Sequence, residues 1–307
     1  MVAVLAIGIT GTFATAAQAA PSSDLTKQIT AMSQKLEKVT ESYNAMNIQL
    51  QQTVKQQQQL TASLPGAKAA LQAATVQMQS IASTAYIQGN MGGFDAILGS
   101  PGDLLQKMSY LDQLSRDRQR DITTYTATTQ DYGSRQAALK TLQAKQAAQV
   151  KVLATTKNTI QAQVNVLLAK RKAAYGRSSD PSYTYNGPIP DLPGSAGKAV
   201  AYAYSKLGKP YLHNAAGPDA FDCSGLTMAA WAAAGKSLPH NAAAQYHATA
   251  RISRSALQPG DLVFYSDLGH VGIYIGGGMI IAAPQTGQNV QKQSVDVMPP
   301  YGYGRVT

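Results

Sequence analysis

The sequence of 307 residues contains a single cysteine, Cys223, and few large aromatic side chains. Tyrosine supplies 16 of the aromatic residues, whereas phenylalanine supplies four and tryptophan one. One cysteine excludes an internal disulfide and any metal site built from several thiolates. The scarcity of Phe and Trp argues against one large globular core, because these side chains bury the most apolar area per residue. We therefore expect a globular domain combined with an extended part.

The N-terminus lacks the Lys or Arg that normally precedes the apolar part of an export signal, but it has the other features of one. Residues 2–13 are mainly apolar, and Ala-Gln-Ala at residues 17–19 fits a cleavage site. We expect residues 1–20 to be a signal peptide and the protein to be secreted. The alternative is a short buried helix. The apolar stretch is too short to span a bilayer, which takes ~20 residues. Exported proteins normally carry structural cysteines in pairs, so Cys223 is either an inert buried thiol or a reactive one.

Residues 24–172 carry apolar side chains at alternating steps of four and three, the heptad spacing of a coiled coil. Glycine clusters at residues 89–93 and 99–102 separate two such series. We predict two long helices that fold back as an antiparallel hairpin; the alternative is one very long helix that pairs with another chain. Pro65 should kink the first helix, although the register continues across it. The first series is Leu25, Ile29, Met32, Leu36, Val39, Tyr43, Met46 and Leu50, continuing from Leu60 to Ile81, and the second runs from Met108 to Leu167.

Charged residues are scarce at 14%, yet they sum to a formal net charge of +10. Between Asp24 and Lys172 there are 17 Lys and Arg residues against 9 Asp and Glu, so most of the excess lies on the predicted coiled coil. This basic surface suits anionic wall polymers, lipid head groups or a protein of a membrane complex. The alternative is a solvated face that keeps the helices soluble. Nucleic acid is not an expected partner, because the protein is exported and carries no recognisable nucleic-acid-binding motif.

Residues 173–197 are rich in Pro, Gly, Ser and Tyr, which predicts an extended linker. Residues 198–307 then have the length of an ordinary compact domain. All four histidines and the one cysteine lie in this domain: His213, His240, His247, His270 and Cys223. A reactive Cys-His pair can therefore only be built there.

Cys223 stands where a helix begins. Asp222 is a favoured N-cap residue, and the Ala-rich run that follows ends at Gly235. This places Cys223 in the first turn, where free backbone N–H groups and the helix dipole stabilise a thiolate and an oxyanion. The position favours a nucleophile; the alternative is a small apolar side chain packed at a helix end.

His270 stands at the start of a predicted strand. Residues 257–265 read as a turn that leads into a strand, residues 269–275 as a second strand that ends at three glycines, and residues 279–283 as the beginning of a third, which together form a meander. From a strand start the imidazole can reach a neighbouring helix start, take the thiol proton and later protonate a leaving amine. We expect His213, His240 and His247 to be surface or rim residues.

Five segments of this domain, in the same order, resemble the NlpC family of bacterial cell-wall cysteine peptidases. The resemblance implies a papain-like α+β fold, Cys223 as nucleophile and His270 as base, without a cofactor. It also implies cleavage of the γ-D-glutamyl to diamino-acid bond of peptidoglycan stem peptides, with Asp222 and Ser224 binding substrate and Tyr211 lining the site near the oxyanion. The predicted coiled coil is similar to those of septal hydrolases of cell division, which restrain the enzyme until a membrane partner relieves it. The segments are Gly208-Lys209-Pro210-Tyr211, Phe221-Asp222-Cys223-Ser224-Gly225-Leu226, residues 258–264, Gly269-His270-Val271-Gly272-Ile273-Tyr274, and Ala283-Pro284.

One position departs from the family. Members usually place a polar residue, most often His, before the Ala-Pro pair to orient the catalytic imidazole, and here that position is Ala282. An alanine cannot orient a ring, so a backbone carbonyl or another side chain would have to do so. The candidate side chains are Gln285, Gln288 and Asn289.

Three functions follow from this sequence. The first is a D,L-endopeptidase of the cell wall, with the hairpin or the Tyr-rich linker (Tyr183, Tyr185) covering the cleft. The second is a non-catalytic wall-binding scaffold in which Ala282 marks decay of the site. The third keeps the Cys-His pair but acts as an amidase or acyl transferase.

Overall fold

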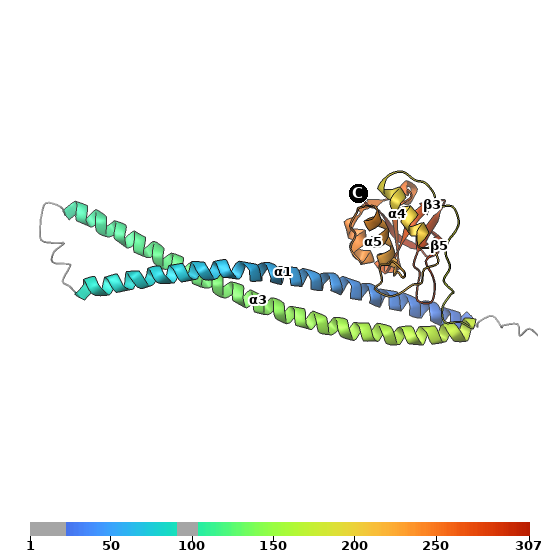
Figure 1. The fold of residues 1–307 in the computed structure, drawn as a ribbon, viewed down its shortest axis with the longest axis horizontal. Coiled ribbons are helices and arrows are strands. Elements are labelled where there is room, and N and C mark those ends of the chain that lie inside the picture. Colours follow the sequence, from blue (N-terminus) through green and yellow to red (C-terminus); the bar gives the residue numbers. More distant parts are fainter. Residues whose placement is uncertain (1–22, 91–103) are drawn as a thin grey trace, which may run out of the picture. The chain divides into compact units, whose positions relative to one another are not determined.

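The computed structural model describes residues 23–90 and 104–307. The predicted signal peptide and most of the Gly-rich tip lie outside the described residues. Two long helices, α1 (Ser23–Asn90) and α3 (Leu104–Tyr175), precede the C-terminal domain (Figure 1). The described residues form two compact units: the ends of the two helices at residues 23–45 and 155–175 group with the rest of the chain to Thr307, and residues 46–154 form the other unit.

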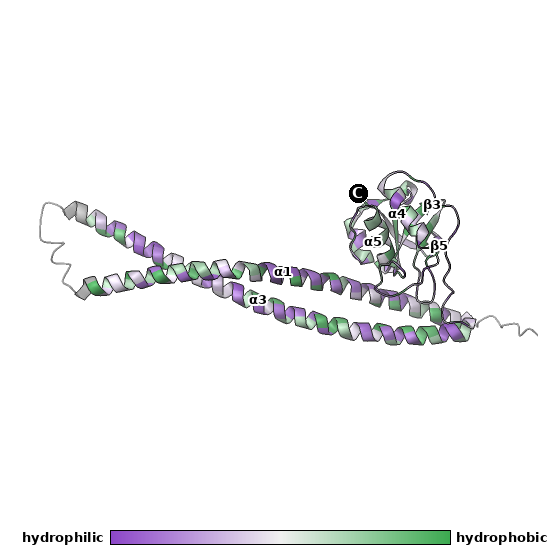
Figure 2. Ribbon diagram, viewed as in Figure 1, coloured by the Kyte–Doolittle hydropathy of each residue, from purple (hydrophilic) through white to green (hydrophobic). Residues whose placement is uncertain are grey.

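The two helices pair antiparallel, as the heptad pattern predicted. In the unit of residues 46–154, Gln77 Nε2 donates to Asp121 Oδ1 at 2.8 Å, and in the other unit Lys170 Nζ donates to Gln28 Oε1 at 2.9 Å. Helix α1 continues without interruption through Pro65. Hydrophilic and hydrophobic residues are interspersed along both helices (Figure 2). Within the described ranges, no helix combines the length and apolarity needed to cross a membrane.

Residues 23–45 of α1 bury two different faces. One face packs Ile29 and Leu36 against Ile160, Leu167 and Ala174 of α3, which is the heptad contact expected from the sequence. The other face is polar and equally buried. Because polar side chains are rarely buried without hydrogen-bond partners, this second face must meet polar groups elsewhere in the same unit. Its members recur at helical spacing: Ser33, Glu37, Thr40, Glu41 and Asn44.

The segment between α3 and the domain lies along the domain surface through specific hydrogen bonds. Buried Arg171, near the end of α3, donates from Nη2 to Gly287 O at 2.9 Å and from Nε to Ser178 O at 3.0 Å. Asn289 Nδ2 donates to Pro181 O at 2.7 Å. These bonds fix the end of α3 and the start of the linker to the loop at residues 284–289.

The C-terminal domain has the α+β architecture that the family resemblance implied. A six-stranded antiparallel sheet has the order β1-β6-β2-β3-β4-β5, so the predicted meander forms its centre as β2, β3 and β4. Helices α4 (Gly194–Ser205), α5 (Cys223–Ala233) and α6 (Ala242–Ala248) accompany the sheet. The strands are β1 (Ala250–Ile252), β2 (Leu262–Tyr265), β3 (His270–Gly276), β4 (Met279–Ala282), β5 (Gln291–Ser294) and β6 (Pro300–Arg305), with 3₁₀ turns η2 (Arg254–Ala256) and η3 (Ser266–Leu268).

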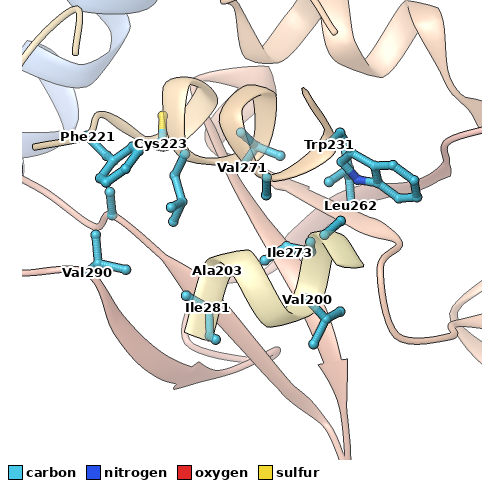
Figure 3. Packing of buried hydrophobic residues seen from close by; sticks show 14 of the residues in the cluster. Val200, Ala203, Phe221, Cys223, Trp231, Leu262, Val271, Ile273, Ile281 and Val290 are labelled. Atoms are coloured by element: carbon cyan, nitrogen blue, oxygen red, sulfur yellow. The ribbon is translucent and has the colours of Figure 1, made fainter. Parts of the chain in front are cut away.

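The main core of the domain lies between the sheet and helices α4 and α5. Val200 and Ala203 of α4 and Val271 and Ile273 of β3 are fully buried in it. Cys223 lies at the edge of this cluster beside Phe221, with its sulfur pointing away from Ala203 and Ile281 (Figure 3). The fold thus holds the start of α5 against the start of β3.

Candidate active site

Cys223 is the first residue of α5, and Asp222 is its N-cap. The Asp222 carboxylate accepts the backbone N–H of Gly225 at 2.7 Å, which confirms the local structure predicted around the cysteine. A side chain at position 225 would not fit, since a Cβ there would lie 2.2 Å from the Ala215 carbonyl oxygen. This tight first turn fixes the direction of the thiol.

The surroundings of the thiol favour its neutral form. Burial raises the pKa of Cys223 well above its ordinary value, and the charges of Glu41, Asp222 and Glu37 raise it further. A hydrogen bond from the backbone of Val271 acts in the opposite direction and lowers this pKa. The thiolate expected from the helix start is therefore not favoured in this arrangement, because burial and three carboxyl groups outweigh the helix N-terminus.

His270 is the first residue of β3. The next residue, Val271, forms the backbone hydrogen bond to the thiol of Cys223. The side chain of His270 is 1% exposed and its ring packs 5.9 Å from that of Tyr265. Three residues in the left-handed region precede it, Ser266, Asp267 and Leu268 of η3, so the backbone turns sharply into the strand. Cys223 and His270 are thus brought together by two different elements, α5 and β3.

Neither ring nitrogen of His270 has a partner of good hydrogen-bond geometry among the described residues. Ala282 lies in β4 and is fully buried; a Cβ built on Gly272, two residues after His270, would approach its methyl group to 3.3 Å. The methyl group therefore lies near His270 but can form no bond to it. Asn289, one of the suggested substitutes, donates to Pro181 instead.

The polar buried face of α1 contacts this site. Glu37 Oε1 lies 3.3 Å from His270 Nδ1, an ion-pair distance without hydrogen-bond alignment. Glu41 Oε1 accepts from Ser224 Oγ at 2.7 Å and lies 3.5 Å from the sulfur of Cys223. One turn of helix thus places one carboxyl group at the imidazole and another at the thiol.

The second oxygen of Glu41 is bound as well. Oε2 accepts from Asn241 Nδ2 at 2.9 Å and from the backbone N–H of Ala242 at 2.6 Å. Burial, followed by the charge of Asp222, raises the pKa of Glu41 to about 7, although the bond from Ser224 lowers it. A carboxyl group of the chain itself therefore binds a set of hydrogen-bond donors beside Cys223.

Asp222 also binds a histidine of the same domain. His240 Nε2 lies 2.8 Å and 3.0 Å from the two carboxylate oxygens, and Asn44 Nδ2 of α1 donates to Oδ2 at 3.2 Å. Burial is the largest single influence and lowers the pKa of His240, but the hydrogen bond to Asp222 and the charges of Asp222 and Glu41 together outweigh it and raise the pKa overall. His240 was expected at the rim; it is half-buried and is a partner of Asp222.

His213 links α1 to the other side of the site. Its Nδ1 lies 2.6 Å from Thr40 Oγ1 and its Nε2 lies 2.6 Å from Thr286 Oγ1. The hydroxyl of buried Tyr211 lies 3.5 Å from the same Nδ1. Burial lowers the pKa of His213 to about 4, so its ring is neutral near pH 7. Of the four histidines, His247 alone is exposed.

The structure brings together the five candidate site residues chosen from the sequence: Cys223, His270, Asp222, Ser224 and Tyr211. Sequence reasoning missed further groups in the site, among them Glu37, Glu41, His240 and Asn241. One signal was present, because Glu37 and Glu41 are the only two glutamates in the chain. Within residues 23–90 and 104–307, no cluster of His, Cys, Asp and Glu suited to a metal ion is found.

The model of the NlpC/P60 family matches residues 208–301, which contain all five of these residues. The C-terminal domain is an NlpC/P60 domain. It is 45% identical over 119 residues to "Probable endopeptidase p60" of Listeria grayi, an alignment that covers 36% of this chain and 23% of that protein. It is 45% identical over 107 residues to "Probable endopeptidase Cgl2188" of Corynebacterium glutamicum, covering 34% of this chain and 51% of the relative. The chain thus spans about a quarter to a half of these relatives.

Solved structures are also similar to part of the chain. The NlpC/p60 domain of the peptidoglycan hydrolase SagA is 35% identical, with 36% of this chain and 98% of that chain covered and a TM-score of 0.34. Rv1477, a hypothetical invasion protein of Mycobacterium tuberculosis, is 28% identical, with 47% and 81% covered and a TM-score of 0.34.

Proposed function

We propose that this protein is a secreted cysteine endopeptidase that hydrolyses the γ-D-glutamyl to diamino-acid bond of peptidoglycan stem peptides in the cell wall. The observation that carries the proposal is the placement of Cys223 in the first turn of α5, beside the start of the strand that begins with His270. It is supported by the NlpC/P60 match and by relatives named probable endopeptidases. The five sequence segments that resemble the family support the same substrate class, because they include both reactive residues.

In the proposed reaction His270 takes the proton of Cys223, and the sulfur attacks the γ-carbonyl carbon of the D-glutamyl residue. Backbone N–H groups at the start of α5 stabilise the resulting oxyanion. The C–N bond breaks as His270 gives its proton to the leaving amine of the diamino acid. Water, deprotonated by His270, then hydrolyses the thioester and releases a γ-carboxylate.

Three neighbouring side chains suit substrate binding in this proposal. Asp222 offers a buried carboxylate, and the Ser224 hydroxyl lies on the same turn. Burial raises the pKa of Tyr211 well above its ordinary value, so its hydroxyl stays protonated and can donate to the oxyanion or the substrate carbonyl.

The contacts of α1 support a self-inhibited form of the enzyme. Cys223 is 2% exposed and His270 1% exposed, and both lie against carboxyl groups of α1. Lys38 adds an exposed ion pair with Asp267, the residue at the centre of η3. The proposed inhibitor is therefore the helical hairpin rather than the Tyr-rich linker, whose Tyr185 packs on Tyr204. Activation requires that residues 23–45 leave the site, and a membrane complex or a wall polymer that binds the basic coiled coil is the proposed trigger.

The test is hydrolysis of a synthetic L-Ala-γ-D-Glu-diamino-acid peptide by the Glu37→Ala/Glu41→Ala variant, followed by mass spectrometry. We expect cleavage between D-Glu and the diamino acid, and a loss of at least ~10³-fold when Cys223→Ala or His270→Ala is added, because either change removes the covalent step. His247→Ala is the matched control, since that histidine is exposed, and its rate should be unchanged.

The same assay separates the alternatives. Release of an acyl-transfer product from this peptide would assign the Cys-His pair to a transferase. Cleavage of the sugar-peptide amide, when the variant is given a muropeptide in place of the peptide, would assign the pair to an amidase. The lack of a hydrogen bond to His270 beside Ala282, among the described residues, is the observation that favours a non-catalytic scaffold. No turnover, together with a Cys223 that does not react with thiol reagents in the double variant, would establish the scaffold and contradict the enzyme.

A further inference from the structure

Glu41 occupies a site built entirely from neutral donors. Its carboxyl group accepts from a hydroxyl, a side-chain amide and a backbone N–H, supplied by Ser224, Asn241 and Ala242. No cation is among these partners. The geometry therefore holds the carboxyl group in place without neutralising a negative charge on it, and an unneutralised charge is costly to bury.

The charged groups around Glu41 add to this cost. Asp222 lies on the far side of Ser224, whose hydroxyl is 2.7 Å from Glu41 and 3.4 Å from Asp222. His240 is paired with Asp222, and its charge lowers the pKa of Glu41, but burial and Asp222 outweigh this effect. Lys38 of α1 pairs with Asp267 instead. The remaining titratable neighbours are Glu37 on the same helix face and the Cys223 and Tyr211 side chains, of which none is cationic.

We propose that Glu41 is a proton-operated latch: its protonated form holds α1 on the catalytic centre, and its ionisation releases the helix. The latch regulates the site of the proposed function, so its effect on hydrolysis rests on that proposal. The release of α1 from Cys223 does not depend on it. In the protonated form the new O–H can donate to the Ser224 oxygen or the Cys223 sulfur, both already within 3.5 Å.

The direction of the pH effect follows from linkage. Released from the site, Glu41 would be an exposed acid with its ordinary pKa of 4.5, whereas burial beside Asp222 raises its pKa to about 7 in the closed form. Burial raises the pKa of Glu37 as well. The pair of His240 and Asp222 lies within the domain and is present in both forms. The closed form therefore binds more protons than the released form, and raising the pH from 4.5 to 7 favours release.

Alkylation of the single cysteine in the full chain reports this opening directly. The rate constant for reaction of Cys223 with iodoacetamide is measured from about pH 5 to pH 8 in the wild type and in Glu41→Ala, which lacks the latch. Dividing the wild-type rate by that of Glu41→Ala at each pH cancels the ionisation of the thiol itself. We expect this ratio to rise roughly 10- to 100-fold across the range, the order of change that a pKa shift from 4.5 to about 7 implies.

Glu41→Gln provides the matched comparison, because its amide has the shape and hydrogen-bonding capacity of the protonated acid. We expect it to keep Cys223 protected at every pH, with a ratio to Glu41→Ala that stays low and flat. Asp24→Asn removes an exposed acid of the same helix and should behave as the wild type. If Glu41→Ala does not fold, Lys38→Glu replaces it as the open reference, since it repels Asp267 at an exposed contact.

A wild-type ratio that does not change with pH overturns the latch, and so does a Glu41→Gln variant as reactive as Glu41→Ala. Neither result depends on substrate. A chain whose thiol becomes reactive as the pH rises, but which cleaves no stem peptide, would leave the latch intact and refute the proposed hydrolysis.

Discussion

Asp222 connects the structure and the chemistry of the site at the scale of a single residue. It caps α5, binds His240 and receives a hydrogen bond from Asn44 of α1. A fully buried carboxylate is stable only when its oxygens are satisfied, so its partners stabilise the fold as well as the site. His240 is the one partner that can carry a positive charge.

Replacing His240 should therefore affect stability in a pH-dependent way. The pKa of His240 is raised in the folded protein, so its stabilising interaction is fully present below its unfolded pKa and is lost as the pH rises through the folded value. We expect His240→Ala to lower the free energy of unfolding by about 1–2 kcal/mol at about pH 5.5 and by less at about pH 8.5. Urea unfolding at the two pH values measures this, with His247→Ala as control.

An equal loss at both pH values would mean that His240 acts only by packing. A loss that is larger at the higher pH would contradict the direction of its pKa shift.

Residues whose role is local could be predicted from the sequence, and those whose role depends on a distant element could not. The position of Asp222 and Cys223 follows from capping, which involves neighbours within one turn. Glu37 and Glu41 have no such signal, because their partners His270 and Ser224 lie some 180 or more positions away in the chain. A polar residue next to a heptad position is ordinarily solvated, so the burial of these two was not foreseeable from periodicity.

At the scale of elements, hydrophobic periodicity predicted the helices and the strands β2, β3 and β4 but not the strands β1, β5 and β6. Strand β6 lies between β1 and β2, yet it contains Gly302 and Gly304, which disfavour a strand. Gly304 is required by packing, since a Cβ there would lie 2.1 Å from Thr249 Oγ1. Such a close approach is a property of the folded domain, so the local sequence carries no trace of it.

Pro65 offers a test of the helix that the heptads predicted. It lies inside α1, where it lacks the N–H needed for a helical hydrogen bond and disfavours the helix by up to ~3 kcal/mol. We expect Pro65→Ala to raise the midpoint of helix melting, followed by far-ultraviolet circular dichroism. The control is Gln58→Ala on an exposed position of the same helix, which should change the midpoint little.

An unchanged or lowered midpoint in Pro65→Ala would show that the proline does not destabilise this helix.

At the scale of the whole molecule, α1 runs through both compact units, but only its residues 23–45 contact the candidate site. Every hydrogen bond from α1 to the C-terminal domain comes from residues up to Asn44 in the described part of the chain. The same segment has its own apolar contact with α3 through Ile29, Leu36 and Leu167. Residues 23–45 should therefore hold the site closed without mechanical support from residues 46–154.

Three glycines inserted after Ala45 test this independence, because they interrupt the helix between the two units. We expect the alkylation rate of Cys223 near pH 6 to stay within about 2-fold of the wild type, since the insertion leaves every contact of the latch in place.

The same insertion after Lys38 is the matched control: it separates Glu41 from Glu37 along the helix, so the two carboxyl groups cannot both reach the site. That variant should react at a rate near that of Glu41→Ala. If the insertion after Ala45 exposes the thiol to the same degree, the distal unit must hold the helix in place, and inhibition is then a property of the whole hairpin rather than of its first 23 described residues.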